Sequence, residues 1–353
     1  MTRLALFLFA VLLAPSVWSE DGGKAWPRNW TVNVSGPWQI TGCPQGNRTL
    51  QVQQDGHRLS QEHGSLEGEV HGHSVSFSVP AQALDCLPHA TALRFDGEAQ
   101  GARIVGMVRA LDDHSRRVAI TIQLQREFML SFDDGPLPGR TDRVLDALKR
   151  LHAQDGKPVR AAFFTVGDAP HGFWEGRAFY APYEIWTDKG SMRAYPELVR
   201  RIVADGHVIG NHSAHHAWFR WPRFDATDVV ANELREWERA LPVPQTEKLF
   251  RPPYLVATAP MLAAAKNANY QIVLGDTVGD AAPGSNVDAI EWKALKILES
   301  RDGSSPALLI FHDILPASFA HLEEIVGRLQ RQGYTLVHFD ARRLDGKTLI
   351  GGN

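Results

Sequence analysis

The chain has few cysteines, little net charge and no long apolar run beyond its first residues. Among its 353 residues are two cysteines, Cys43 and Cys86, so a scaffold of several disulfides and a zinc site built from thiolates are both excluded. The 37 basic and 40 acidic residues leave a net charge of -3, which argues against a nucleic-acid-binding protein. A hydrophobic fraction of 44% excludes wholesale disorder. What stands out instead is histidine, with 15 residues.

The start of the chain has the pattern of a signal peptide. Arg3 precedes an apolar run over residues 4–14, and Pro15 ends it, shortly before an expected cleavage after Ser19. The run is short for a membrane span, so an uncleaved anchor is the weaker alternative. Residues 1–19 are therefore interpreted as a signal peptide. The mature chain is expected to be exported, either periplasmic or secreted, without stable membrane insertion.

Residues 20–126 have the period-two pattern of a small β-rich domain. Apolar residues alternate with small or polar ones over 75–79 and 118–124, and Asp-Gly turn signals lie between such runs. This pattern predicts an all-β antiparallel sandwich or barrel. Cys43 and Cys86 both fall within it, and an oxidising compartment would allow them to form a disulfide bond, although the sequence leaves their pairing open. The role of this domain is also open between carbohydrate binding, covering of a cleft and assembly.

After residue 126 the period of the apolar residues changes. Short apolar runs alternate with segments in which apolar residues recur three and four positions apart. The runs cover residues 128–132, 161–165, 208–210, 249–251, 271–274, 307–311 and 335–337. Strands that alternate with helices predict a parallel sheet, because parallel neighbours need crossover connections. The predicted fold class is α/β, a distorted (β/α) barrel of about seven strands over residues 127–345, followed by a tail at 346–353.

Chemistry in such a barrel lies where the strands end, and two of these ends are rich in ionisable residues. Asp133 and Asp134 end the first run, with a plain Asp-Gly turn as the alternative. His212 and His216 follow the third run four residues apart, so a helical turn would let both imidazoles share a metal ion. His215 is a competitor for the same role, and a polar loop is the alternative without a metal.

Two further strand ends deliver ionisable residues. Arg251 ends the fourth run before two prolines that restrict its backbone, and His312 follows the sixth run. A capped core histidine is the alternative at the second position. Because so many candidates fall at the C-terminal ends of strands of one predicted barrel, independent accident at every position is a poor explanation.

In this order the motifs resemble those of the polysaccharide deacetylases, the family four carbohydrate esterases with a NodB homology domain. That family has the motifs S/T-F-D-D-G, H-S/T-x-x-H, R-x-P-Y, an aspartate-containing motif and hydrophobic-x-H. The corresponding segments of this chain are 131–135, 212–216, 251–254, 276–280 and 310–312. The resemblance covers about residues 126–342 and leaves the β-rich domain outside.

The resemblance implies a metal-dependent hydrolase. Asp134, His212 and His216 would be the protein ligands of a divalent metal ion, with zinc as the expected metal. A metal-bound water would attack the acetyl carbonyl. Asp133 would be the general base that takes a proton from this water, and Arg251 would orient Asp133.

The same resemblance implies roles for residues around this centre. His312 would protonate the leaving amine as general acid, and the backbone N–H of Tyr254 would bind the oxyanion. Ile310 would replace the leucine that lines the acetyl-methyl pocket. The fourth motif departs from the family pattern D-x-x-D-W, because it lacks the tryptophan and is one residue longer. Asp280 is assigned to tune the histidine acid, with Asp276 as the alternative.

Aromatic residues concentrate near the predicted site. Trp186 lies in a long insert between the first and second motifs, and Trp218 follows the second motif. Because aromatic faces stack on sugar rings, both are candidate substrate-binding residues. The alternative is that these segments pack their aromatic residues onto the barrel.

The sequence therefore predicts an enzyme that removes N-acetyl groups from the sugars of an extracytoplasmic polysaccharide, such as peptidoglycan or a chitin-like polymer. An O-deacetylase acting on acetylated xylan or an exopolysaccharide would use the same metal centre and is the alternative enzyme. A catalytically inactive glycan-binding protein is the alternative of another class, although every ligand, base and acid position is filled. The expected partner is an acetylated polysaccharide and not a nucleic acid.

Overall fold

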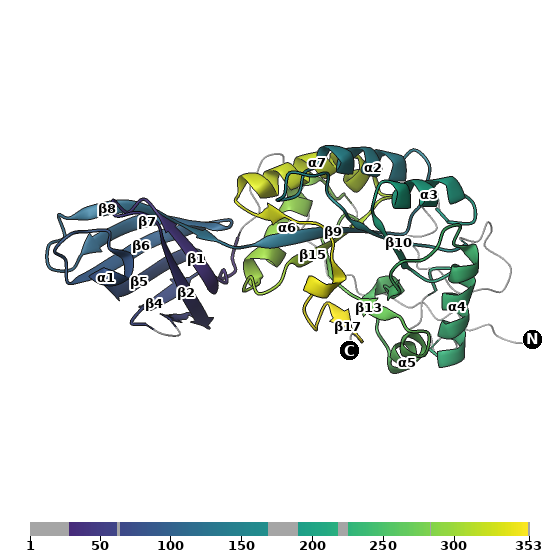
Figure 1. Cartoon of the computed structure of the whole chain (residues 1–353), viewed down its shortest axis with the longest axis horizontal. Coiled ribbons are helices and arrows are strands. Elements are labelled where there is room, and N and C mark those ends of the chain that lie inside the picture. Colours follow the sequence, from purple (N-terminus) through teal and green to yellow (C-terminus); the bar gives the residue numbers. More distant parts are fainter. Residues whose placement is uncertain (1–27, 62–63, 169–189, 218–224, 283, 352–353) are drawn as a thin grey trace, which may run out of the picture.

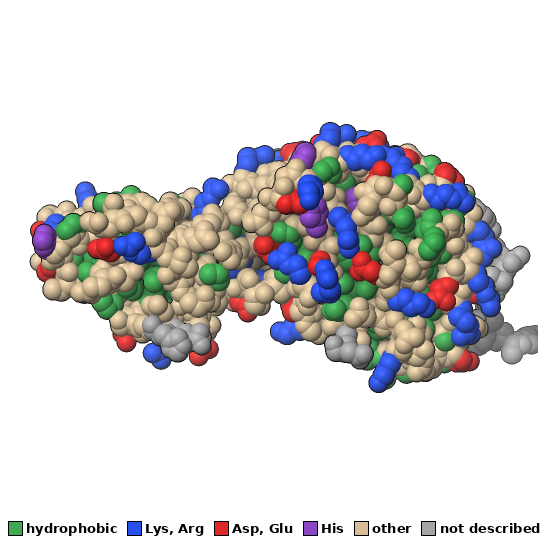
Figure 2. Space-filling model, viewed as in Figure 1, with side chains coloured by type: hydrophobic (Ala, Val, Ile, Leu, Met, Phe, Trp, Pro, Cys, Tyr) green, Lys and Arg blue, Asp and Glu red, His purple; other side chains and the backbone are tan. Residues whose placement is uncertain are grey.

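The computed structural model describes residues 28–61, 64–168, 190–217, 225–282 and 284–351. These residues form an all-β barrel and an α/β domain that follow each other along the chain (Figure 1). In the space-filling view of Figure 2 the molecule is elongated, with the barrel as its narrower part. The α/β architecture predicted from the apolar periodicity, with a small all-β domain before it, is confirmed.

The described residues before 126 form a closed antiparallel barrel. Its strands are β1 (Gly36–Thr41), β2 (Arg48–Asp55), β3 (Arg58–Gln61), β4 (Glu67–His71), β5 (Ser74–Pro80), β6 (Ala92–Gln100), β7 (Arg103–Ala110) and β8 (Arg117–Leu124). The barrel closes because β1 pairs with both β2 and β8. Strand β5 shows why these residues form it, since Val75, Phe77 and Val79 are buried and alternate with partly exposed serines. Of the two predicted forms, sandwich or barrel, the barrel is the one present.

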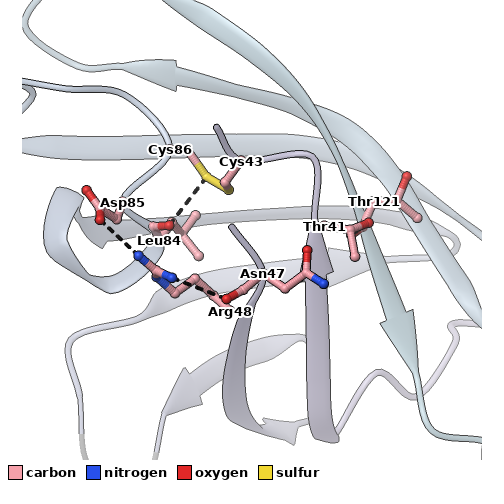
Figure 3. The surroundings of a disulfide bond; sticks show 8 residues. All are labelled: Thr41, Cys43, Asn47, Arg48, Leu84, Asp85, Cys86 and Thr121. Atoms are coloured by element: carbon pink, nitrogen blue, oxygen red, sulfur yellow. Dashed lines mark hydrogen bonds and ion pairs between the residues drawn. A yellow bond between two sulfur atoms is a disulfide. The ribbon is translucent and has the colours of Figure 1, made fainter. Parts of the chain in front are cut away.

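A disulfide bond joins Cys43, just after β1, to Cys86, just after the short helix α1 (Ala81–Leu84) (Figure 3). Beside it, Arg48 donates a hydrogen bond to Asp85 at 2.9 Å. The two cysteines are 43 residues apart, so the bond restricts the unfolded chain considerably. Loop-closure entropy for such a separation corresponds to about 4 kcal/mol of stabilisation. The pairing that the sequence left open is therefore present in the structure.

The α/β domain is built on one curled sheet. Its strands are β9 (Glu127–Asp133), β10 (Ala162–Thr165), β11 (Val208–Asn211), β12 (Leu249–Phe250), β13 (Gln271–Val273), β14 (Asp276–Thr277), β15 (Ala307–His312), β16 (Thr335–Leu336) and β17 (Leu349–Ile350). The helices are α2 (Thr141–Arg150), α3 (Pro196–Ala204), α4 (Thr227–Ala240), α5 (Ala259–Asn267), α6 (Val287–Ser300) and α7 (Pro316–Arg331), with 3-10 turns at Pro253–Leu255 and Ala341–Arg343. None of the helices in the described part of the chain is long and apolar enough to cross a membrane.

The sheet curls until its two ends almost meet. Its order is β14-β15-β9-β10-β11-β12-β13-β17, with β16 beside β9. Only Leu274 and Gly275 separate β13 from β14, so the covalent chain bridges the gap where the described strands form no ladder. A Cβ at Gly275 would lie 2.9 Å from the carbonyl oxygen of Leu308 and 3.1 Å from Ile310 Cδ1, which explains the glycine. The sheet is therefore a distorted barrel that the hydrogen-bond ladder leaves open.

The end of the chain contributes to this sheet. The prediction of a tail after residue 345 is wrong at Leu349–Ile350, because these residues form β17 and pair antiparallel with β13. Leu349 also packs against the apolar cluster that contains Phe164 and Val273. A strand edge at β13 would otherwise present unpaired backbone groups, and β17 covers it.

The strands of the curled sheet have an apolar face toward the helices and a second face toward the interior of the curl. Phe132, Phe163 and Phe311 come from adjacent strands and pack against one another, with ring centroids 4.9 Å and 5.9 Å apart, in the cluster that also contains the helix residues. Because side chains alternate along a strand, Ser131 and Asp133 then face the interior of the curled sheet. The apolar face thus anchors the helices while the opposite face can carry polar groups.

The barrel contacts the α/β domain through Glu299, near the end of α6. The Glu299 side chain is only 2% exposed. Its carboxylate accepts hydrogen bonds from Trp30 Nε1 at 2.8 Å, from Arg28 at 3.3 Å and from His73 Nε2 at 3.1 Å. The backbone N–H of Asn33 donates to the Glu299 carbonyl oxygen at 2.7 Å. One residue therefore ties the N-terminal segment and the barrel to a helix of the other domain.

This contact lies at the N-terminal side of the sheet. Strand β9 leaves the barrel and runs into the centre of the α/β domain (Figure 1). Its 7 residues extend over about 23 Å at 3.3 Å per residue. The barrel is therefore at one end of β9, and the strand ends that carry Asp133 and His312 are at the other.

We expect Glu299→Ala to lower the free energy of unfolding by about 2–4 kcal/mol, because it removes the buried acceptor of three side-chain donors. Urea unfolding followed by circular dichroism measures the change. The matched control is Glu324→Ala on the exposed face of α7, where a partly exposed pair with Arg328 is lost and a change below about 1 kcal/mol is expected. Equal effects of the two substitutions would contradict the importance of the Glu299 contact.

Candidate functional site

Ionisable side chains gather in the interior at the C-terminal ends of β9, β11, β12 and β15. Asp133 is the last residue of β9, His312 is the last residue of β15, and the two are register partners. His212 follows β11 directly, and Arg251 follows β12 directly. Parallel strands end at the same edge, so residues far apart in sequence meet there. The structure thus brings the candidates from four strand ends into one cluster.

Arg251 and Asp133 form a fully buried ion pair. The Arg251 side chain is 0% exposed, and its Nη1 lies 2.6 Å from Asp133 Oδ1. The guanidinium also donates to Ser131 Oγ at 2.9 Å and to the Val273 carbonyl oxygen at 3.2 Å, and it lies 3.9 Å from the ring centroid of Phe164. Burial lowers the pKa of Arg251, and the attraction of Asp133 opposes this. Because an unpaired buried charge is costly, the pair holds the Asp133 carboxylate in one orientation.

Asp134 faces two imidazoles. Its Oδ1 lies 3.3 Å from His212 Nε2 and 3.2 Å from His216 Nε2, and these ligand atoms are all within 4.8 Å of one another. Nδ1 of His212 donates to the Arg251 carbonyl oxygen at 2.8 Å, so the neutral ring presents the lone pair of Nε2 to Asp134. Burial would raise the pKa of Asp134, but the attraction of His216 and contact with His212 hold it well below its usual value.

These residues fit a divalent metal ion. Among the residues that the structure describes, no hydrogen-bond donor of suitable geometry meets the buried Asp134 Oδ1. When neither Nε2 carries a proton, the ionised carboxylate and the two imidazole lone pairs repel one another, and a cation between them would remove this repulsion. Two imidazoles and one carboxylate are a donor set that zinc accepts, with positions left for other ligands.

The segment that carries the two histidines is not helical, contrary to the prediction of a helical turn. Ser213 and His216 have positive φ values of 66° and 52°. The backbone N–H of His212 donates to the Thr165 carbonyl oxygen at 3.0 Å, which continues the contact between β10 and β11 into the loop. The two imidazoles therefore converge because the loop bends through left-handed residues, and not because of a 3.6-residue period.

His215, the competing ligand, contacts a different group. Its Nδ1 lies 2.9 Å from Glu233 Oε1, and its Nε2 lies 3.7 Å from Glu236 Oε2, both on α4. The backbone N–H of His215 donates to Glu233 Oε2 at 2.9 Å. The hydrogen bond to Glu233 raises the pKa of His215. Of the two neighbouring histidines, the structure therefore places His216 beside Asp134.

His312 is held by Asp280. Its Nδ1 lies 2.9 Å from Asp280 Oδ1, and its backbone N–H donates to Asp280 Oδ2 at 2.6 Å. Ser318 on α7, which the sequence analysis did not single out, donates to the same Oδ2 at 2.5 Å. The Nε2 of His312 lies 4.0 Å from Asp134 Oδ2. Burial would lower the pKa of His312, but the attraction of Asp280 outweighs it and raises this pKa to about 10.

Tyr254 and Ile310 lie close to the cluster. Tyr254 has a φ of 60°, and its ring centroid is 4.9 Å from that of His216. Ile310 is buried two residues before His312 on the same strand, so both side chains face the interior. Both positions are thus compatible with contacts to a small group bound beside Asp134.

The other predicted residues are not part of the cluster that the structure describes. Asp276, the alternative to Asp280, pairs instead with Arg301 at 2.6 Å. Trp186 and Trp218, the candidate sugar-binding residues, lie outside the described residues.

The sequence analysis also missed Asp313, a buried carboxyl group beside the loop that follows β9. Asp313 Oδ2 accepts a hydrogen bond from Thr141 Oγ1 at 2.5 Å, and burial raises the pKa of Asp313 to about 7. A Cβ at Gly135 would lie 2.2 Å from Asp313 Oδ2, so the Asp-Asp-Gly loop needs glycine there for packing. The position of Asp313 directly after His312 was the only signal in the sequence.

Comparison with known proteins agrees with the motifs. Residues 123–273 match the polysaccharide deacetylase family. This match contains the Asp133, His212 and Arg251 motifs and ends before Asp280. The α/β domain of this chain therefore resembles the polysaccharide deacetylases over residues 123–273.

Similar proteins are named as peptidoglycan deacetylases or as a carbohydrate esterase. A peptidoglycan-N-acetylglucosamine deacetylase of Bacillus cereus is 27% identical over 214 residues, which are 59% of this chain and 84% of that protein. The deacetylase PgdA of Listeria monocytogenes is 27% identical over 226 residues, which are 61% of this chain but only 38% of that protein. A solved family 4 carbohydrate esterase from Streptomyces lividans, in complex with acetate, has a TM-score of 0.45 and 23% identity, over 60% of this chain and 91% of that one.

In the metal-free protein we expect Asp280→Asn to lower the pKa of His312 by about 1–3 units, because the imidazolium loses its closest negative charge. In the wild type this pKa is raised to about 10, whereas the unfolded chain has a value of about 6.5. The charged ring therefore stabilises the folded state fully below about pH 6.5, and this stabilisation is lost as the pH rises through about 10. Histidine-selective NMR titration measures both values. Asp276→Asn is the control, and a His312 titration unaffected by Asp280→Asn would contradict the assignment.

Proposed function

We propose that this chain is a metal-dependent deacetylase that removes N-acetyl groups from the glycan strands of peptidoglycan. The observation that carries the proposal is the convergence of Asp134, His212 and His216 beside a second carboxylate, Asp133, that has its own cationic partner. The substrate class is supported by the relatives, which are named as deacetylases of peptidoglycan-N-acetylglucosamine and, in Bacillus subtilis, of peptidoglycan-N-acetylmuramic acid.

Asp134, His212 and His216 would hold the metal ion, for which zinc is proposed because its sites accept imidazole and carboxylate ligands. When bound there, the ion would polarise the acetyl carbonyl and lower the pKa of a water molecule. The Nδ1 hydrogen bond of His212 to the Arg251 carbonyl would keep that ring in the required tautomer.

Asp133 and His312 would move the protons. Arg251 holds Asp133 Oδ1, while Oδ2 lies 3.9 Å from His212 Nε2 and is the atom that would accept a proton from the attacking water. His312 keeps Nδ1 on Asp280 and would give the proton on Nε2 to the leaving amine. One proton is then taken from water and one is delivered to nitrogen, so that acetate and a free amine are the products.

Substrate contacts are proposed at four further residues. The backbone N–H of Tyr254 would bind the oxyanion, and Ile310 would border the methyl group of the acetyl moiety. Trp186 and Trp218 would contact the sugar rings.

The barrel is proposed to act away from the reaction. It joins the N-terminal end of β9, whereas Asp133 lies at the C-terminal end. Of its aromatic side chains, Trp38, Phe77 and Phe95 are buried in its core, and Trp30 donates to Glu299 at the contact with α6. The described barrel therefore lacks an exposed aromatic platform of the kind that stacks on sugars. Its disulfide bond and the N-terminal apolar run support export to an oxidising compartment.

We expect Asp133→Asn to lower acetate release by at least about 100-fold without loss of bound metal, because the amide cannot accept the proton. His216→Ala should lose the metal itself. Metal content per chain and acetate release from a peptidoglycan fragment measure both effects. His321→Ala, an exposed histidine on α7, is the control for removal of an imidazole. A fully metallated and active His216→Ala variant would point to His215 as the ligand.

The choice of acetyl group is tested with a panel of substrates. We expect chelator-sensitive acetate release from N-acetylated peptidoglycan fragments and little from acetylated xylan, because similar proteins are named as peptidoglycan deacetylases. Release from xylan alone would establish the O-deacetylase instead. No release from any acetylated glycan, together with binding of one, would establish a glycan-binding protein without activity.

A further inference from the structure

One carboxylate anchors the loop that carries the two histidines to helix α4. Glu233 Oε2 accepts the backbone N–H of His215 at 2.9 Å, and Glu233 Oε1 lies 2.9 Å from His215 Nδ1. Both side chains are largely buried, with 15% of Glu233 and 10% of His215 exposed. The two oxygens of one side chain therefore hold both the main chain and the ring of the residue that precedes His216.

This anchor acts where the loop adopts an unfavourable backbone conformation. Ser213 and His216 both have a left-handed backbone conformation. Residues other than glycine rarely adopt this conformation, and it persists only where the surrounding structure enforces it. At the first of these positions, the Ser213 backbone N–H donates to Asn211 Oδ1 at 2.8 Å. At the second position, the preceding residue is held by Glu233. The loop is thus restrained on both sides of Ala214.

Glu236 provides a natural comparison on the same helix. It also approaches His215, but its Oε2 is 3.7 Å from Nε2 and its side chain is 45% exposed. Among the described residues, no hydrogen bond joins Glu236 to the main chain of the loop, whereas Glu233 accepts one from a backbone N–H. Removal of Glu236 therefore changes the charge near His215 without releasing the loop.

We propose that Glu233 is a positioning residue for the metal centre, holding His216 in the geometry of a ligand through His215. This inference rests on the proposed metal site and adds a residue that lies outside all five motifs. A carboxylate is needed because both of its oxygens accept hydrogen bonds. A glutamine has one acceptor oxygen, so its amino group would face a donor unless the His215 ring changes its tautomer and its hydrogen bonding.

The test is the affinity of the metal-free full chain for Zn²⁺, measured by competition with a chromogenic chelator well below the unfolding temperature. Partners that orient metal ligands typically contribute 10- to 100-fold to affinity, and we expect Glu233→Gln to weaken binding by about 10-fold or more. Glu236→Gln should change it by less than about twofold. The absorption spectrum of the Co²⁺-loaded Glu233→Gln variant should also change, because His216 is no longer held in one orientation.

Other outcomes would overturn the proposal. Unchanged Zn²⁺ affinity of Glu233→Gln, with only a lower urea midpoint, would assign Glu233 to stability alone. Loss of a second equivalent of Zn²⁺, with the first site intact, would instead establish a separate cation site formed by His215, Glu233 and Glu236. Retention of Zn²⁺ by His216→Ala would show that His216 is not a ligand, and the role of Glu233 in holding it would be rejected.

Discussion

The buried ion pair between Arg251 and Asp133 is the interaction on which the rest of the site depends. It joins the end of β12 to the end of β9 across the interior, where an unpaired charge would be costly. Because Arg251 occupies one oxygen of Asp133, the two adjacent aspartates have different surroundings. Asp133 lies beside a guanidinium, while Asp134 faces two imidazoles. The carbonyl oxygen of Arg251 also orients His212, so one residue connects Asp133, the proposed base, to His212, a proposed metal ligand.

The contact that joins the two domains and the residues of the candidate site lie at opposite ends of the strands. At the N-terminal end of β9, Glu299 ties the barrel to α6 with three side-chain hydrogen bonds. At the C-terminal end, the interior face presents carboxylates and imidazoles instead of apolar side chains. The curl of the sheet makes this possible, because it brings the end of β12 to the end of β9 although β10 and β11 lie between them in the strand order. Gly275 and Gly135 serve this arrangement by allowing close approach of neighbouring groups.

Much of the fold and the site could be predicted because the signals are local. Buried parallel strands are continuous apolar runs, and the polar residue that ends each run marks the edge where strands meet. The left-handed conformations of Ser213 and His216 could not be predicted in this way, since such conformations are uncommon for serine and remain a minority even for histidine. Glu233, Ser318 and Asp313 were missed for a related reason. Each acts on a partner placed beside it by helix packing or by a loop crossing, and no spacing in the sequence marks such contacts.

By itself the sequence determined the order of the elements, the class of the fold and the residue types available at each strand end. The tertiary structure decided which atoms meet. It placed His216 beside Asp134 and turned His215 to Glu233, it selected Asp280 over Asp276 as the partner of His312, and it added β17 to the sheet. The physical reason is that each of these contacts joins separate elements. Their distances depend on how the sheet curls and the helices pack, which local residue patterns do not specify.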